Sequence, residues 1–335
     1  MVPRQPRLRD VAQAAGVSVS LVSSFLNTPE LVAEKSSVKI AKAVEELGFV
    51  PNQAARQLRS GKSKMLALVA FDVGDPFFAA VARGARRRAS AAGLSLVLAD
   101  TDGDRDAERQ YLSLFEEHRV RGLILAPVDE EDAQLDRLAA RGIPGVLLDQ
   151  DASSARWSSV SVDNAAGGEI AVRHLLDQGS RRIAVIGGTL DIPQVVLRRK
   201  GAARAVRRHD DSALIVVDTE TRDAAAGRES VARLLASETR FDGLFCINDS
   251  VASGALQALE DSGLRVPADV AVVGYNDMAA DVGGIPHLSS VRHPHEEFGA
   301  AAVELVLERL GDVDVPPRQI RFSPELITRR SSQRI

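Results

Sequence analysis

The residues LRDVAQAAGVS at positions 8–18 decide how the amino-terminal part of the chain folds. Their apolar members recur at i, i+3, i+4 and i+7, the spacing of a short amphipathic helix: Leu8, Val11, Ala12 and Ala15. Gly16 then stands where a glycine commonly ends a helix, and Ser18 can cap the start of a second one. The stretch therefore predicts two helices joined by a tight turn.

The residues that follow continue the helical pattern. The second helix would bury Val22, Phe25 and Leu26 and end at residues 27–29, which read Asn-Thr-Pro. A third helix carries its own apolar series and closes at a glycine: Ile40, Val44, Leu47 and Gly48. Three short helices of this kind are typical of a helix-turn-helix unit. A generic helical hairpin would show the same apolar periodicity.

The charge balance sets this segment apart from the rest of the chain. The net charge is −4, yet residues 1–62 hold nine Lys and Arg against five Asp and Glu, and the remainder holds 33 against 41. The second helix also offers small polar side chains that can reach phosphates or base edges: Ser18, Ser20, Ser23, Ser24 and Asn27. A basic segment on an acidic body favours a polyanionic partner; the alternative is a solvated basic surface.

Residues 52–61, which read NQAARQLRSG, can form one or two helical turns. Helices shorter than about 12 residues are marginal in water, so this linker is predicted to become helical only when it is held in place. Leu58 is the one large apolar residue between Val50 and Met65. It either packs within the linker or acts as a wedge in the minor groove of DNA.

These motifs together resemble the headpiece of the LacI/GalR family of bacterial transcription regulators. The resemblance rests on residues 8–18, 22–23 and 26–27, and on Pro51-Asn52 followed by Ala55 and Leu58. It implies that Val19, Ser20 and Ser24 read bases in the major groove and that Leu58 wedges at the operator centre. The full set of DNA-binding residues that it implies is Arg7, Ser18, Val19, Ser20, Ser23, Ser24, Asn27, Asn52, Ala55, Leu58 and Arg59.

Three headpiece positions depart from the family pattern. Ser24 stands where the recognition helix usually has Arg, Leu21 stands where Thr is usual, and Arg7 replaces a common Thr. Serine cannot make the bidentate contact that arginine makes with guanine. The operator sequence of a relative is therefore not transferable to this chain.

From Met65 onward, short apolar runs alternate with helical stretches. The predicted strands are Leu66–Phe71, Leu94–Ala99, Gly122–Ala126, Gly145–Asp149, Ile183–Ile186, Leu214–Val217, Leu244–Ile247 and Val270–Val273. Predicted helices between them include Phe78–Ala92, Asp132–Arg141, Gly168–Gln178, Glu229–Ala236 and Ala252–Ser262. This alternation indicates parallel sheets covered on both faces. It predicts two doubly wound α/β lobes, with ligand at the carboxyl ends of the strands.

The family resemblance extends through the body, for example in Asp75-Pro-Phe-Phe78, Arg198-Arg-Lys-Gly201 and residues 269–275. It implies a periplasmic-binding-protein-like body whose two lobes enclose a small effector. The expected parts are a headpiece at 1–50, a hinge at 51–63 and a body at 64–335, with an N lobe of about 64–162 and 291–321 and a C lobe of about 163–290 and 322–330. An extracytoplasmic sugar-binding protein would share the body and lack the headpiece.

The same resemblance implies a set of cleft residues: Asp72, Phe77, Asp149, Arg198, Asn248 and Asn276, with Phe78 and Arg222 as further candidates. Carboxylate, amide and guanidinium groups suit the hydroxyls of a sugar, and an aromatic ring suits its apolar face. Alternatives remain for several of them. Asp72 and Asp149 can cap turns, Arg198 can be a surface arginine, and one of the two phenylalanines can belong to the core.

Two departures in the body bear on the effector. Asn276 stands where the family usually has Asp, so that one charge is missing. Arg222 stands where many members place a Phe or Trp that stacks on the ligand. Together with Arg198 it would put two cations in the cleft. This predicts a charged effector such as a sugar phosphate or sugar acid, unless Arg222 points to solvent.

Composition and the remaining motifs argue against other classes. A single cysteine, Cys246, excludes a disulfide framework and cysteine zinc clusters. No secretory signal and no membrane-spanning stretch is recognised, which predicts a cytoplasmic protein, associated with the nucleoid when bound to DNA. Residues 61–63 read Gly-Lys-Ser without the earlier glycine of a P-loop. His293-Pro-His295 lacks further metal ligands and fits the surface start of a helix. No catalytic residue, metal or cofactor is predicted.

The sequence therefore predicts a DNA-binding transcriptional repressor of carbohydrate-related genes, controlled by a sugar-like effector. Two headpieces of a homodimer would bind a pseudo-palindromic operator. No apolar heptad extension precedes Ile335, which favours a dimer over a tetramer. Two alternatives stay open: control by a protein partner with a vestigial cleft, and a cleft enzyme that acts on a sugar.

Overall fold

The computed structural model describes residues 6–50, 63–128, 133–150, 156–188, 192–237, 239–278, 287–312 and 314–334. The chain divides into two compact units, Met1–Ser63 and Lys64–Ile335. Four predicted DNA contacts lie outside the described residues: Asn52, Ala55, Leu58 and Arg59.

The described part of the amino-terminal unit is a helical bundle with one 3₁₀ turn: α1 Leu8–Ala15, α2 Val19–Asn27, η1 Pro29–Leu31 and α3 Glu34–Leu47. Gly16 and Gly48 end α1 and α3 with φ of 65° and 59°, a left-handed conformation that glycine adopts without strain. Ser18 caps α2, because its Oγ accepts a hydrogen bond from the backbone N–H of Leu21 at 3.1 Å. The predicted helix-turn-helix unit is confirmed.

A small apolar core holds these helices together: Val11, Ala12, Ala15, Val22, Ile40, Ala43 and Phe49. The core differs from the predicted one at the end of α3. Leu47 lies in the last turn of that helix and is 37% exposed. The chain turns at Gly48, so that Phe49 is buried instead.

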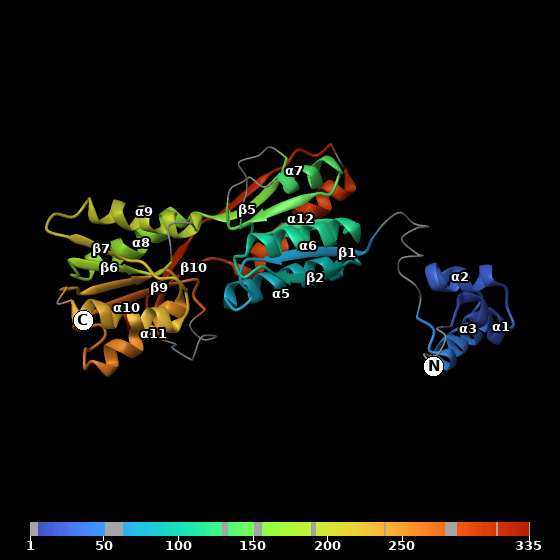
Figure 1. Cartoon of the computed structure of the whole chain (residues 1–335), viewed down its shortest axis with the longest axis horizontal. Helices are drawn as coiled ribbons and strands as arrows, with labels where there is room; N and C mark the ends of the chain where they lie inside the picture. Colours follow the sequence, from blue (N-terminus) through green and yellow to red (C-terminus); the bar gives the residue numbers. More distant parts are fainter. Residues whose placement is uncertain are drawn as a thin grey trace. The chain divides into compact units, whose positions relative to one another are not determined.

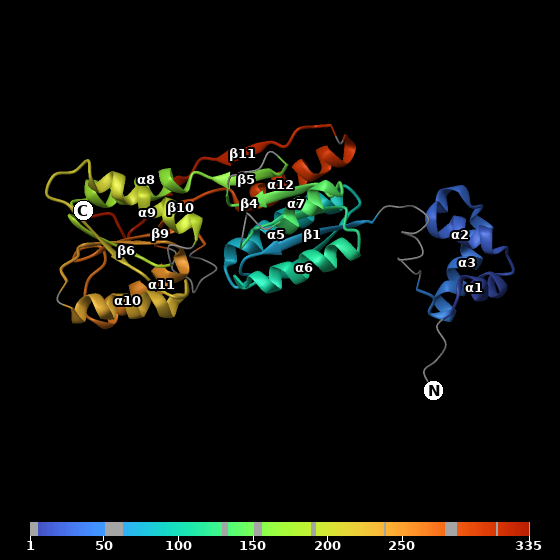
Figure 2. The ribbon, with the colours of Figure 1, turned by 45° about the horizontal axis from the view of Figure 1, so that its top comes forward.

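The body contains two six-stranded sheets in its described residues (Figures 1 and 2). In the N lobe the order is β11-β5-β4-β3-β1-β2, and every neighbouring pair is parallel. Its strands are β1 Met65–Ala70, β2 Ser95–Asp100, β3 Gly122–Leu125, β4 Gly145–Leu148, β5 Ser158–Val162 and β11 Gln319–Phe322.

The C lobe repeats this arrangement with one change of direction. Its order is β12-β10-β9-β8-β6-β7, and only the pairing of β12 with β10 is antiparallel. Its strands are β6 Arg182–Ile186, β7 Ala213–Val217, β8 Gly243–Cys246, β9 Ala271–Tyr275, β10 Ser289–Arg292 and β12 Glu325–Ile327.

Helices cover both faces of each sheet. In the N lobe, Leu66 and Leu68 of β1 face the core shared with α5 and α12, whereas Ala67 and Val69 face the core shared with α6 and α7. In the C lobe, α8 and α9 pack together on one face, and α10 and α11 on the other (Figure 1). These helices are α5 Pro76–Ala91, α6 Arg105–Glu117, α7 Ala133–Ala140, α8 Asn164–Asp177, α9 Pro193–Val206, α10 Ala224–Ala236, α11 Asp249–Asp261 and α12 His295–Gly311. The predicted doubly wound lobes are confirmed.

The lobes are discontinuous in sequence. The described chain crosses between them after β5, after β10, and between β11 and β12. Strand β10 belongs wholly to the sheet of the C lobe, so the second crossing follows Arg292 rather than residue 290. The third crossing lies between Phe322 and Glu325.

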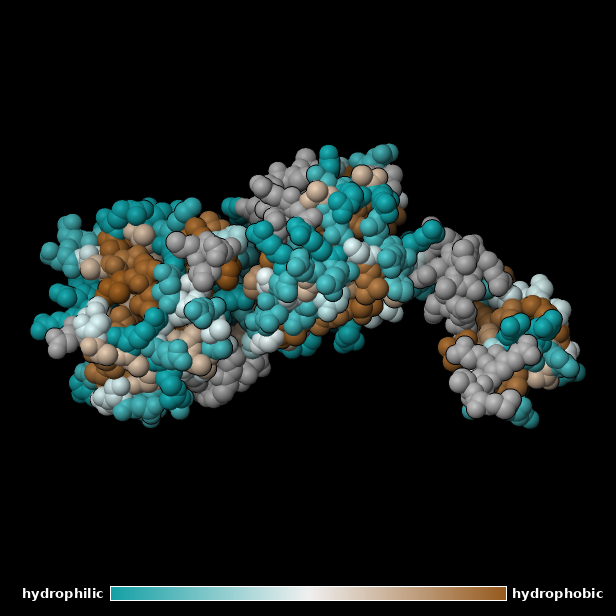
Figure 3. Space-filling view, viewed as in Figure 1, coloured by the Kyte–Doolittle hydropathy of each residue, from teal (hydrophilic) through white to brown (hydrophobic). Residues whose placement is uncertain are grey.

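The surface of the body is mixed in polarity. Figure 3 shows an apolar patch on the C lobe, over the region of β6 and β7. Val216 of the edge strand β7 is 47% exposed. None of the described helices is long and apolar enough to cross a membrane.

Candidate functional site

Helix α2 presents an uncharged polar surface with one apolar side chain at its start. Val19 is 44% exposed, and Ser20 and Asn27 are exposed, whereas Ser23 and Ser24 are half-buried. Asn27 Nδ2 donates to the backbone oxygen of Ser23 at 2.8 Å. The first residues of α2 therefore offer a methyl-bearing side chain and a hydroxyl, which match a thymine methyl group and base-edge acceptors.

Arg7, the residue before α1, supplies a cation close in sequence to α2. Arg7 is exposed, and its backbone N–H donates to Asp10 Oδ2 at 2.7 Å, which fixes the first turn of α1. An exposed guanidinium at this position suits a phosphate.

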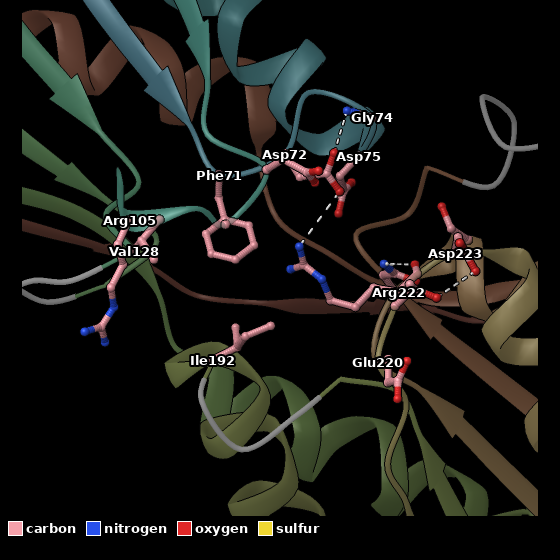
Figure 4. A pocket seen from close by; sticks show the side chains of 15 residues that line it. Phe71, Asp72, Gly74, Asp75, Arg105, Val128, Ile192, Glu220, Arg222 and Asp223 are labelled. Carbon is pink, nitrogen blue, oxygen red and sulfur yellow. Dashed lines mark hydrogen bonds and ion pairs between the residues drawn. The ribbon is translucent and has the colours of Figure 1, made fainter. Parts of the chain in front are cut away.

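A cavity of about 670 Å³ opens in the body (Figure 4). Its walls come from both lobes, and most of its residues follow the carboxyl ends of β1, β2, β3, β7 and β8: Phe71, Asp72, Gly74, Asp75, Asp102, Gly103, Arg105, Val128, Ile192, Glu220, Thr221, Arg222, Asp223, Asn248 and Ser250. This is where open parallel sheets place ligands. Among the predicted effector residues, Asp72, Arg222 and Asn248 lie here.

Three residues that line this cavity contact one another, and this group is named the mouth: Phe71, Asp72 and Arg222. Arg222 Nη2 lies 3.8 Å from Asp72 Oδ2, and the Arg222 guanidinium carbon lies 4.8 Å from the centre of the Phe71 ring. Asn248 Nδ2 donates to the backbone oxygen of Arg222 at 2.9 Å, while its Oδ1 accepts from the N–H of Val251. Asn248 therefore both caps α11 and fixes Arg222.

Beside the cavity lies a network made of the buried residues Asn164, Arg198 and Tyr275 and the half-buried Asp149. Arg198 Nε donates to Asn164 Oδ1 at 2.7 Å, Arg198 Nη1 donates to the backbone oxygen of Ile247 at 2.7 Å, and its guanidinium stacks 3.7 Å from the centre of the Tyr275 ring. Asn164 Nδ2 donates to Asp149 Oδ1 at 3.2 Å, which joins the start of α8 to the end of β4. Arg198 is thus a core residue and not a surface arginine.

Burial shapes the acid–base properties of this network. It raises the pKa of Asp149 to about 6, although the Arg198 guanidinium opposes the shift. Burial also raises the pKa of the Tyr275 hydroxyl to about 12 and raises the pKa of Asp75, whose carboxylate accepts from the N–H of Phe77. Near neutral pH, Asp149 is therefore closer to its protonation midpoint than an ordinary aspartate.

Phe77 and Phe78 do not line the cavity. Both belong to the N-lobe core, at 5% and 7% exposure, and the Phe77 ring packs against Phe78, Phe298 and His293. The expectation that only one of the two is core is wrong, because both rings pack in the N-lobe core at the start of α5. Phe71, at the end of β1, supplies the aromatic surface instead.

Asn276 and His293 do not line the cavity either. Asn276 Oδ1 is 3.3 Å from His293 Nε2, and both residues are buried. The surface location predicted for the His-Pro-His stretch is therefore wrong for His293, although α12 does begin at His295. No group of three or more His, Cys, Asp or Glu suited to a metal ion is found among the described residues.

The two predicted cations do not face a common ligand space. Arg222 lines the cavity, whereas Arg198 is held in the buried network. Carboxylates outnumber cations on the walls: Asp72, Asp75, Asp102, Glu220 and Asp223 against Arg105 and Arg222. Arg222 points into the cleft rather than to solvent, but its surroundings disfavour a phosphate or a carboxylate.

Several residues of the site were not predicted from the sequence. Phe71, Asp102 and Glu220 stand at or just after the ends of β1, β2 and β7. The rule that ligands bind at the carboxyl ends of parallel strands would find them if it were applied strand by strand. Asn164 and Tyr275 carried no comparable signal, because their role depends on contact with Arg198.

Comparisons with known proteins agree with this architecture. Residues 7–52 match the model described as bacterial regulatory proteins, lacI family, and residues 172–332 match a periplasmic binding protein-like domain. The HTH-type transcriptional repressor PurR of Aliivibrio fischeri is 32% identical over 332 residues, which cover 97% of this chain and 97% of that protein.

Two solved structures extend the comparison over the whole fold. A lac repressor dimer bound to operator and the anti-inducer ONPF is 27% identical with a TM-score of 0.84, covering 99% of this chain and 100% of that one. The transcriptional regulator CelR in complex with cellobiose is 28% identical with a TM-score of 0.71, covering 98% and 100%. Because the relatives are repressors, the enzyme alternative is set aside. The chain belongs to the lacI family of bacterial regulatory proteins and is a DNA-binding transcriptional repressor.

Proposed function

We propose that this repressor controls carbohydrate-related genes and responds to a small, hydroxyl-rich effector that binds between its two lobes. The observation that carries this proposal is the cavity whose walls come from both lobes at the carboxyl ends of their strands. A ligand in such a place contacts both lobes at once. Its binding energy can therefore favour one lobe arrangement over another.

The chemistry of the cavity supports a sugar-like ligand. Carboxylates and the Asn248 amide can pair with adjacent hydroxyls, and Phe71 offers a flat apolar surface. The relative CelR was solved with cellobiose. The excess of carboxylates favours a neutral ligand, or one rich in hydrogen-bond donors, over a sugar acid or sugar phosphate.

The DNA side of the proposal assigns roles to the headpiece residues. Val19, Ser20 and Ser24 read base edges, while Arg7, Ser18, Ser23 and Asn27 contact phosphates. The hinge, residues 51–63, contributes Asn52, Ala55, Leu58 and Arg59, with Leu58 as the minor-groove wedge. Two chains form a homodimer that spans a pseudo-palindromic operator, as in the lac repressor dimer bound to operator.

Effector and operator are coupled through the orientation of the lobes. The division into an N lobe, a C lobe and a hinge gives the route, because a change between the lobes alters the separation of the two hinges in a dimer. Coupling of about 1–3 kcal/mol would change operator affinity roughly 5- to 150-fold.

The test begins with thermal unfolding of the full chain against neutral sugars, amino sugars, sugar acids and sugar phosphates. A ligand that binds only the folded state raises the stability by about 2.7 kcal/mol at 100 times its dissociation constant.

The chain is then used to select its operator from random duplex DNA, and its affinity for the operator is measured with and without the ligand. A ligand that shifts unfolding and leaves operator affinity unchanged contradicts the proposal. A response of the cavity variant Asn248→Ala that equals that of the parent also contradicts it. No shift with any ligand would favour control by a protein partner.

A further inference from the structure

Arg222 fills part of the ligand space of the unliganded protein. It follows β7 in the C lobe, and its guanidinium reaches two residues that follow β1 in the N lobe (Figure 4). The ion pair with Asp72 spans 3.8 Å, and the stacking distance to Phe71 is 4.8 Å. Among the ion pairs between described residues, this is the one that joins the two lobes. Two hydrogen bonds also join them, from Asn164 Nδ2 to Asp149 Oδ1 at 3.2 Å and from Gln194 Nε2 to the backbone oxygen of Asp149 at 2.9 Å.

The backbone that carries Arg222 is held in place from several sides. Asn248 Nδ2 donates to the Arg222 oxygen at 2.9 Å, and Thr219 Oγ1 donates to the Thr221 oxygen at 2.6 Å. Thr219 Oγ1 in turn accepts from the N–H of Gly188, and Asp223 caps α10 through the N–H of Ala226. The side chain of Arg222 therefore extends from a backbone position that is fixed by hydrogen bonds.

Its surroundings are those that a ligand would meet. A guanidinium is a flat cation with five donors, so it pairs with a carboxylate through its edge and with an aromatic ring through its face. Asp72 and Phe71 supply those two partners, and further carboxylates of the cavity, Asp75 and Glu220, add to the negative field.

We propose that Arg222 is a built-in occupant of the effector cleft, which adds to the contacts that hold the lobes together in the free protein and which the effector displaces. This inference rests on the proposed function for its effector, although the contact itself exists without one. It also selects the ligand class. A molecule with hydrogen-bond donors and a flat apolar face can replace Arg222 on Asp72 and Phe71, whereas a phosphate or a carboxylate would leave Asp72 facing an anion.

The contact of Arg222 with Asp72 and Phe71 is weak, as expected for a side chain that a ligand has to displace. Asp72 and Arg222 are both partly exposed, at 35% and 22% of their side chains, so water screens their attraction. Cation–π contacts at such sites are also weak. We expect removal of the contact to change the ratio of closed to open lobes by roughly three- to tenfold.

The experiment measures the distance between the lobes in the full chain without ligand. Spin labels go on Glu117→Cys of α6 and Glu229→Cys of α10, both exposed, while the native Cys246 is buried and does not react. Distance distributions are recorded for this parent, for Arg222→Ala, for Asp72→Asn and for Arg265→Ala. The last variant is the matched control, because Arg265 pairs with Asp269 on the surface and outside the cavity.

Methylguanidinium at millimolar concentration is the probe, with tetramethylammonium at the same ionic strength as the salt control. Arg222→Ala should broaden and lengthen the distance distribution, and methylguanidinium should restore it by filling the vacated place. Asp72→Asn should open the lobes in the same way without rescue, because the anion that binds the probe is gone. Arg265→Ala should behave like the parent throughout.

Two results would overturn the inference: an unchanged distribution in Arg222→Ala, or a response to methylguanidinium that Arg265→Ala shares. If Arg222→Ala unfolds, as judged by near-ultraviolet circular dichroism, Arg222→Gln replaces it with the same expectations. Operator affinity of the parent is measured separately. A chain that binds no operator would contradict the proposed function and leave the lobe measurement valid.

Discussion

The buried network and the mouth of the cavity each centre on one arginine, and the two arginines are held very differently. Arg198 is 7% exposed and donates at 2.7 Å to Asn164 and to the Ile247 oxygen. Arg222 makes one ion pair at 3.8 Å and faces a cavity. Hydrogen bonds are stronger in a low-dielectric interior, whereas solvent screens charges at an open mouth.

The difference separates two tasks that one cleft has to perform. Contacts of the buried network join α8, α9 and the ends of β4, β8 and β9, so they fix the geometry that a ligand meets. The contact of Arg222 with Asp72 and Phe71 can open at small cost and lies in the wall of the cavity. Variants of each region should therefore differ in the size of the stability change, in its pH dependence and in its salt dependence.

The largest effect is expected for Arg198→Ala. This change removes the Arg198 donor from the buried Ile247 oxygen, and it leaves Asn164 Oδ1 with the longer hydrogen bond from the Tyr275 hydroxyl at 3.2 Å. Breaking a buried charged hydrogen-bond network costs about 3 kcal/mol of unfolding free energy. Urea denaturation measures the loss.

Lys200→Ala, an exposed change two residues further along α9, is the control and should alter stability by less than about 0.5 kcal/mol. A loss below about 1 kcal/mol for Arg198→Ala would show that the network is no more rigid than the mouth.

Asp149→Asn should give the next largest change in unfolding free energy, and this change should be an increase. The folded protein raises the pKa of Asp149 from 3.8 to about 6, so the folded state binds this proton more tightly than the unfolded chain. The stability that the group contributes is present below pH 4 and is lost as the pH rises toward 6. One pKa unit corresponds to about 1.4 kcal/mol, so the loss is about 2–3 kcal/mol.

The amide that Asp149→Asn introduces carries no charge to bury and can still accept the hydrogen bond from Asn164. The variant should match the parent near pH 4 and exceed its stability at pH 7.5 by about 2 kcal/mol. Thermal unfolding across that range measures both. A difference that does not depend on pH would argue against a raised pKa of Asp149 in the folded protein.

Most of the fold could be predicted from the sequence because most strands of the body are continuous apolar runs. Strands such as Met65–Ala70 and Gly243–Cys246 are buried on both faces of a parallel sheet. The four strands that sequence reasoning missed lack this signature. Strand β5 reads Ser-Ser-Val-Ser-Val, β10 reads Ser-Ser-Val-Arg, and the edge strands β11 and β12 are only partly buried. Their place is set by pairing with distant strands, which a local pattern does not record.

The candidate site was predicted less completely than the fold. Asp72, Asn248 and Arg222 do line the cavity. The direction of a side chain depends on packing, however: Phe77, at the start of α5, packs in the core, whereas Phe71, just after β1, lines the cavity. The partner of Arg222 could not be inferred from sequence spacing. Asp72 precedes it by 150 positions, and the two meet only because the strands β1 and β7 end on either side of the cleft.

The smallest effects are expected at the mouth, for Arg222→Ala and Asp72→Asn. Each should lower the unfolding free energy by less than about 1 kcal/mol in low salt, because the pair is partly exposed. Asp72→Asn keeps an oxygen that can accept from the N–H of Gly74, so the turn itself survives. At 1 M salt the Debye length falls to about 3 Å, and both differences in unfolding free energy should nearly vanish.

Arg198→Ala should lose as much stability in 1 M salt as in 50 mM salt, because Arg198 makes direct hydrogen bonds that are out of contact with water. Urea titrations of the three variants at the two salt concentrations measure these differences. A loss of stability in Arg222→Ala that does not depend on salt would show that Arg222 is a structural residue like those of the buried network. It would also remove the reason to expect that a ligand can displace Arg222.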